Sequence, residues 1–173
     1  MTVILAGPMR FDLTHTFDAP PEKVAAGMLD REFQETVTDI GDLHERRVLS
    51  QQELPDGRLT RAVRNVLALE ISGMARSMLG DSDPAWVQEE QWDAARTHCD
   101  WQIHPEVAAD LLSAQGTIDL ANSGDKTTRT VAGDVKVRVP IYGGKVERWI
   151  VDGVSRAYDD EADLLARWLE REN

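Results

Sequence analysis

The sequence predicts an α+β domain, in which an antiparallel sheet is covered on one face by helices. Two short helical segments follow the first strand pattern, about six further strand patterns succeed one another, and a long amphipathic segment ends the chain. Strands that follow one another through short turns form antiparallel hairpins, and such a sheet buries one of its faces against helices. The order of the patterns therefore indicates the fold class before any single residue is considered.

The composition is that of an ordinary folded domain. The 173 residues are 42% hydrophobic and 29% charged, and no linker or low-complexity tract divides them, which predicts a single domain over residues 1–173. The formal net charge of −12 disfavours nucleic acid as a partner, because a phosphate backbone would be repelled. We expect a cytoplasmic protein without stable membrane insertion, since it has one cysteine, nothing like a signal peptide and no run of about 20 apolar residues.

The N-terminal part predicts one strand and two short helices. Residues 9–17 alternate apolar and polar side chains, as a half-buried strand does. The following DAPPEKV stretch predicts a helix with proline in its first turn, where the missing N–H has no helical partner in any case. Asp30 is expected to cap a second short helix that ends near Gly41.

The middle of the chain predicts three pairs of strands, two of which are joined by the turn signals PDG and NSGDK. The expected strands are residues 44–54, 58–69, 86–92, 97–104, 112–121 and 127–139. Between the first and second pairs, EISGMARSMLG has helical spacing with Met74 and Met78 on its apolar face. Methionine adapts its shape to its neighbours, so this segment is either a gate over an internal cavity or a plug that caps the core.

The last strand gives way to a long amphipathic helix. Pro140 ends the strand because it cannot donate a ladder hydrogen bond, and Gly143 and Gly144 let the chain reverse. Gly153 and Ala157 make the middle of the apolar stripe thin, so the sheet either approaches closely there or leaves a cavity. The stripe consists of Val146, Trp149, Ile150, Gly153, Val154, Ala157, Leu164, Leu165, Trp168 and Leu169.

Several stretches resemble a known family: FDAPPEKV after the first strand, a tryptophan in the fourth strand, and VAGDVKVRVPIYGGKVE running into the last helix. They are similar to an uncharacterised, largely actinobacterial domain-of-unknown-function family of the START-like (SRPBCC) superfamily, over roughly residues 9–168. The resemblance implies a helix-grip fold, a curved seven-stranded antiparallel sheet around a long C-terminal helix with two short helices after the first strand. It also implies an elongated cavity for a lipid or another apolar ligand between sheet and helix.

Ten residues are candidates for contacting a ligand in such a cavity. His15 shares a strand face with apolar side chains and is expected to point inward, either as a hydrogen-bonded core histidine or as a polar anchor. Arg61 shares the face of Asn65 but could equally extend its charged end into solvent. The candidates are His15, Asn65, Met74, Met78, Trp92, Trp101, Tyr142, Trp149, Gly153 and Ala157.

The sequence contains no catalytic, metal-binding or cofactor motif. It lacks a phosphate-binding loop and a GxSxG elbow, its histidines do not have the spacing of a zinc site, and Cys99 fits a small buried apolar position. We therefore expect a non-catalytic carrier or sensor of an apolar small molecule or lipid, without metal or cofactor. Two alternatives stay open: a cyclase- or aromatase-like enzyme acting on a hydrophobic ligand, and a protein-interaction domain with a collapsed cavity.

Overall fold

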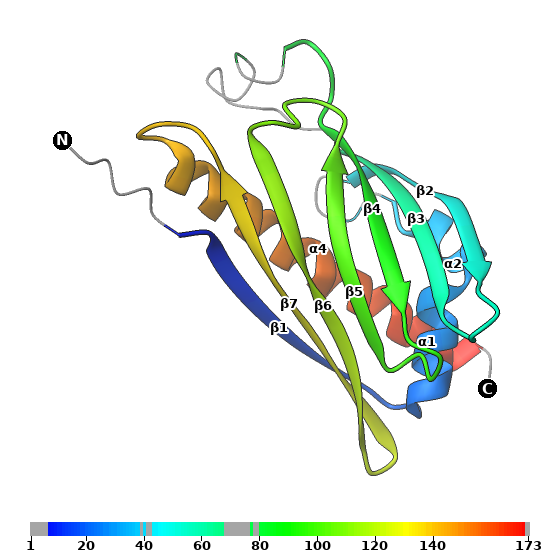
Figure 1. Ribbon diagram of the computed structural model, residues 1–173. Coiled ribbons are helices and arrows are strands. Elements are labelled where there is room, and N and C mark those ends of the chain that lie inside the picture. The colour runs from blue at the N-terminus through cyan, green and yellow to red at the C-terminus, as the bar shows by residue number, and fades with distance from the viewer. Residues whose placement is uncertain (1–6, 39, 41–42, 68–76, 78–79, 172–173) are drawn as a thin grey trace.

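The computed structural model describes residues 7–38, 40, 43–67, 77 and 80–171. Met74 and Met78 lie outside the described residues, so the gate and the plug stay alternatives. Figure 1 labels the helices and strands. Their bounds are β1 (Met9–Phe17), α1 (Pro21–Leu29), α2 (Arg31–Thr36), β2 (Leu43–Glu53), β3 (Leu59–Leu67), β4 (Ala85–Trp92), β5 (His98–Pro105), β6 (Leu112–Ser123), β7 (Lys126–Val137) and α4 (Gly143–Arg171).

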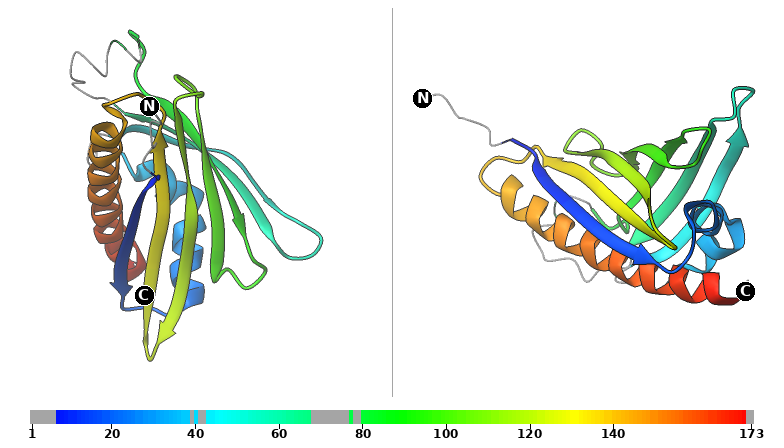
Figure 2. Two further views of the ribbon diagram at one scale, coloured as in Figure 1. Left: turned by 60° about the vertical axis from the view of Figure 1, so that its left-hand side comes forward. Right: turned by 90° about the horizontal axis from the view of Figure 1, so that it is seen from below.

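The seven strands form one antiparallel sheet in the order β1-β7-β6-β5-β4-β3-β2. The sheet is curved, and α4 runs along its open side, with α1 and α2 near the C-terminal end of α4 (Figure 2). This arrangement confirms the predicted helix-grip fold. No helix formed by the described residues is long and apolar enough to span a bilayer.

Side-chain alternation decides which face of the sheet turns toward α4. Along β1, Phe11 and Phe17 are buried while the residues between them alternate between exposed and half-buried. The register aligns Phe11 with Gly133, Gly133 with Gly116, and Gly116 with Trp101. A Cβ atom on either glycine would lie 2.6 Å from Trp101 Cζ2, so the indole packs directly on the backbone of β6 and β7. Phe11 stacks on this indole, with ring centroids 6.2 Å apart.

The short helices close one end of the structure. Pro21 begins α1, and the Phe33 N–H donates to Asp30 Oδ1 at 2.9 Å, which confirms the predicted cap of α2. The helix α2 ends at Thr36, earlier than predicted. At Gly27 a Cβ atom would lie 2.9 Å from Leu165 Cδ1, so α1 packs closely on the C-terminal half of α4.

The two halves of α4 differ in how well they are covered. Its start is fixed to the sheet, because the buried Glu147 carboxylate accepts a hydrogen bond of 2.9 Å from the Val137 N–H. Its second half buries Leu165 and Leu169, whereas none of residues 148–160 is fully buried. The prediction that the sheet covers Trp149 is wrong: this side chain is 43% exposed. The contacts of α4 with the described strands are concentrated on β1 and β7.

Candidate ligand-binding site

Charged and polar side chains enter the space between the sheet and α4. Five of them have exposed fractions of only 0–4%, so they belong to the interior: Arg61, Asn65, Glu90, Arg129 and Glu161. We refer to the set as the interior polar cluster. It consists of Arg46, Arg61, Asn65, Glu90, Arg129, Tyr158 and Glu161.

The first ion pair of the cluster joins β3 to β4. Glu90 Oε2 accepts hydrogen bonds from Arg61 Nε at 2.9 Å and Trp92 Nε1 at 2.9 Å, and lies 2.7 Å from Arg61 Nη2. Arg61 Nη1 also donates to the Met28 carbonyl oxygen at 2.8 Å, which ties the end of α1 to the sheet. Arg61 is therefore an interior residue, which settles the alternative that the sequence left open.

The second ion pair joins β7 to α4. Arg129 Nη1 donates to Glu161 Oε2 at 2.8 Å and to Oε1 at 3.2 Å, and both side chains are buried. The guanidinium also lies over the rings of Phe17 and Tyr158, at 5.3 and 5.7 Å from their centroids. A buried charge needs such a surrounding, because an unpaired one would be strongly destabilising.

His15 points inward as predicted and uses both of its ring nitrogens. Its Nε2 lies 2.8 Å from Asp159 Oδ1, and Arg129 Nη2 lies 3.2 Å from its Nδ1. The consistent assignment has Nε2–H donating to Asp159 and Nδ1 accepting from Arg129. A ligand or a substrate proton would have to displace one of these partners before it could bond to His15.

Arg46 enters the interior from β2, because it pairs with the buried Asn65 across the β2–β3 ladder. Its Nε atom is buried and has no hydrogen-bond partner among the described residues. Burial lowers the pKa of the Arg46 guanidinium, although the negative charge of Glu161 acts in the opposite direction. Burial also raises the pKa of Tyr158, to about 12, so this phenol stays protonated. Within the part of the chain that the structure describes, Arg46 is thus the guanidinium of the cluster without an ion-pair partner.

Beside the cluster, apolar side chains at the end where α4 begins are only partly buried. They come from the ends of β3 to β7 that meet there and from the first half of α4, as follows: Leu67, Trp86, Ile103, Leu112, Val139, Val146, Ile150, Val151 and Val154. We call this set the half-open apolar end. On the same half of α4, the one atom of the described residues within 4 Å of a Cβ atom placed at Gly153 is Arg156 Nη2, at 3.9 Å, so none of the described strands approaches this position closely.

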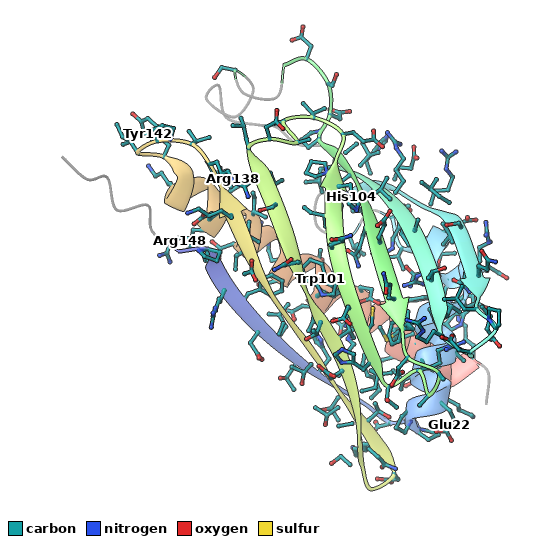
Figure 3. The ribbon with its side chains drawn as sticks, in the orientation of Figure 1. Glu22, Trp101, His104, Arg138, Tyr142 and Arg148 are labelled. Atoms are coloured by element: carbon teal, nitrogen blue, oxygen red, sulfur yellow. The ribbon has the colours of Figure 1, made fainter. Side chains whose placement is uncertain are left out.

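The predicted contact residues divide into two groups. The structure places His15, Asn65, Trp92 and Trp101 on the inner side of the sheet, and Gly153 and Ala157 half-buried on α4. Tyr142 and Trp149 are 46% and 43% exposed. Figure 3 shows Tyr142 at the tip where α4 begins, near Arg138 and Arg148, and Trp101 over the middle of the sheet.

Two depressions of about 430 and 460 Å³ lie on the opposite, outer face of the sheet. Their polar rims come from side chains that alternate with the interior ones, such as Glu89, Gln102 and Asp134. Neither of the two lies between the sheet and α4.

Within the described part of the chain, no three histidine, cysteine, aspartate or glutamate side chains are placed to hold a metal ion. Burial raises the pKa of the Cys99 thiol, which is fully enclosed.

Sequence reasoning missed most of the interior polar cluster. The missed residues are Arg46, Glu90, Arg129, Tyr158 and Glu161. Strand parity was the available signal for two of them: Glu90 lies two residues before the buried Trp92, and Arg129 two residues before the buried Val131. Charged residues in such positions are inward-facing, and each therefore requires an interior partner.

Comparisons with known proteins agree with this architecture. The family model described as "Protein of unknown function (DUF2505)" matches residues 12–169. No curated protein matches the chain. Among solved structures, the Zhui aromatase/cyclase from Streptomyces sp. R1128 has a TM-score of 0.67 at 14% identity, covering 95% of each chain. A START superfamily protein from Mycobacterium smegmatis has a TM-score of 0.61 at 15% identity, covering 95% of this chain and 99% of the other. A protein from Thermus thermophilus has a TM-score of 0.65 at 17% identity, covering 91% of this chain and 97% of the other. The TM-scores indicate a shared fold.

Proposed function

Because the chain belongs to the DUF2505 family of proteins of unknown function and has a START-like fold, we propose that it binds an apolar small molecule or lipid between sheet and α4, as a carrier or sensor. The half-open apolar end is the observation that carries this proposal. Its nine apolar side chains are only partly buried although they line the inner side of the sheet and helix. Binding an apolar guest would remove this surface from water, at about 25 cal/mol per Å².

The first test is direct. Native mass spectrometry of the purified protein should reveal an adduct that solvent extraction removes, or the emptied protein should take up added dodecanol or laurate with one-to-one stoichiometry. Absence of any adduct together with no uptake of either compound would refute the proposal.

A variant at Gly153 locates the site. Gly153→Leu should lower the affinity for dodecanol at least several-fold without lowering the melting temperature, because leucine favours the helix and its side chain meets no close neighbour among the described residues. Asp152→Leu is the matched control, since Asp152 is the adjacent exposed residue of the same helix. Equal binding by both variants would place the ligand elsewhere.

An enzyme of the cyclase or aromatase type is the second candidate, and the interior polar cluster is the observation that favours it. The ionisable groups of the cluster argue against an enzyme, because they already have partners. Both ring nitrogens of His15 are hydrogen-bonded, and Glu90 and Glu161 each pair with an arginine. A general acid or base needs a proton site within reach of the substrate. Recovery of a bound ligand with a mass different from that of the compound added would favour the enzyme.

A further inference from the structure

The interior polar cluster has one more positive charge than negative charge. Three arginines, Arg46, Arg61 and Arg129, face two glutamates, Glu90 and Glu161. Arg61 lies 2.7 Å from Glu90, and Arg129 lies 2.8 Å from Glu161. Each carboxylate is thus committed to one guanidinium, and the uncompensated charge belongs to Arg46.

Arg46 also carries a donor that an acceptor would satisfy. Among the described residues, Arg46 Nε is one of five buried side-chain atoms without a hydrogen-bond partner. An apolar ligand would leave this donor unsatisfied, whereas an anion would accept its hydrogen bond and neutralise its charge at once.

Arg46 lies where the two environments meet. In the register, Arg46 is opposite Asn65, and Asn65 is opposite Trp86. Asn65 is a buried member of the interior polar cluster, while Trp86 belongs to the half-open apolar end. A molecule whose apolar body occupies that end would therefore bring one terminus to the Arg46 guanidinium.

From this placement we propose that Arg46 binds the acidic head group of the ligand, which makes the ligand an amphipathic anion with an apolar body. This inference rests on the proposed function, because it names the chemical class of molecule that enters the same site. The head group is a carboxylate or a phosphate, both of which a guanidinium can bind through two parallel hydrogen bonds.

Calorimetric titration with laurate, dodecyl phosphate and dodecanol tests the proposal, because the three probes share one chain and differ in the head group. Laurate or dodecyl phosphate should bind at least about tenfold more tightly than dodecanol. Arg46→Met should remove that difference by weakening the binding of the two anions, and Arg46→Lys should retain part of it. The stronger of the two anions identifies the head group.

Arg47→Met is the matched control, because Arg47 is the next residue of β2 and its side chain is exposed. This variant should bind all three probes as the unmodified protein does. A thermal melt guards against misfolding: Arg46→Met should melt no lower than the unmodified protein, because it removes a half-buried charge that has no ion-pair partner among the described residues.

The outcomes separate the two proposals. Binding of dodecanol with no preference for either anion, or an anion preference that survives in Arg46→Met, would overturn the role of Arg46 and leave the proposed function standing. No binding of any of the three probes would overturn both.

Discussion

At the scale of single residues, the buried ion pairs are the points where a small change has the largest effect. Removing one partner of a buried pair destabilises a protein by about 3–5 kcal/mol, because the remaining charge stays in a poorly solvated site. Glu90 should show this effect more strongly than Glu161, because one of its carboxylate oxygens accepts hydrogen bonds from both Arg61 and Trp92. Loss of its charge therefore affects β3, β4 and the end of α1 at the same time.

We expect Glu90→Gln to lower the free energy of unfolding by about 3 kcal/mol, because it leaves Arg61 charged and unpaired in the interior. Chemical denaturation measures this change. Glu89→Gln is the control, since Glu89 is the neighbouring exposed residue on the outer face. If the double variant Arg61→Met, Glu90→Gln is no more stable than Glu90→Gln alone, the unpaired charge is not the cause.

On the outer face, His98 gives a measurable titration. The hydrogen bond to Asp119, 2.6 Å long, raises the pKa of His98 above its ordinary value of 6.5. Because the pKa is raised, the pairing of protonated His98 with Asp119 contributes fully to the free energy of unfolding below pH 6.5. This contribution is lost as the pH rises through the pKa of His98 in the folded protein. Both side chains are about half exposed, so the effect on the unfolding free energy is small.

The measurement is an NMR titration of the His98 ring. The midpoint should lie above 6.5, and Asp119→Asn should lower it. A midpoint that does not respond to this substitution would show that Asp119 is not the cause.

Strand parity predicted that His15, Asn65 and Trp101 face inward, because alternation is a local property. Partner choice is not local. Arg129 meets Glu161 only because α4 docks against β7, and the two residues are 32 positions apart. Arg46 was hidden for a different reason: the β2–β3 register shifts between Leu43 and Glu45 and again between Val48 and Ser50. Each shift interrupts the alternation on which a parity argument depends.

At the scale of elements, α4 combines a tightly packed half with a half-open one. Its second half packs against α1 through Leu165 and Leu169, whereas its first half leaves Gly153 in open surroundings. The sequence predicted the length and the start of this helix well, because its apolar period and its glycines are local signals. It did not predict the exposure of Trp149, because the width of the covered stripe depends on which strands lie beneath the helix.

Two glycine substitutions test this difference between the halves. Gly153→Ala should raise the unfolding free energy by up to about 1 kcal/mol, or roughly 2–4 °C in melting temperature, because alanine favours the helix and meets no close neighbour. Gly27→Ala has the same helical advantage in α1 but places its Cβ atom 2.9 Å from Leu165 Cδ1 and 3.1 Å from Leu169 Cδ2. We expect it to stabilise less than Gly153→Ala or to destabilise. The reverse order in a thermal melt would contradict the contrast between the two halves of α4.

At the scale of the whole molecule, the charge of the interior polar cluster is opposite in sign to the net charge of the chain. The chain has a formal net charge of −12, while the interior polar cluster retains one positive charge. An anionic ligand is therefore repelled as it approaches and attracted only after it enters. Added salt screens the repulsion between separated charges much more than it weakens a buried contact.

We accordingly expect the association rate constant of laurate to rise between about 0.01 M and about 0.15 M salt, as the screening length falls from about 30 to about 8 Å. Stopped-flow tryptophan fluorescence can measure this rate below the micellar concentration of laurate. Dodecanol, which has no charge, is the control and should associate at the same rate in both conditions. A laurate rate that falls with salt would show that the ligand enters past a positive surface.

The order of strands in the sheet has a consequence for the synthesis of the chain. The first strand, β1, has β7 as its neighbour in the sheet, with Met9 opposite Val135 and Phe17 opposite Thr127. Most of the polypeptide must therefore leave the ribosome before the first strand can find its place. Contacts between such distant positions slow folding, because a long loop has to close before they form. We therefore expect the hairpins β2–β3 and β6–β7 to form early, and β1 and α4 to complete the domain at the end.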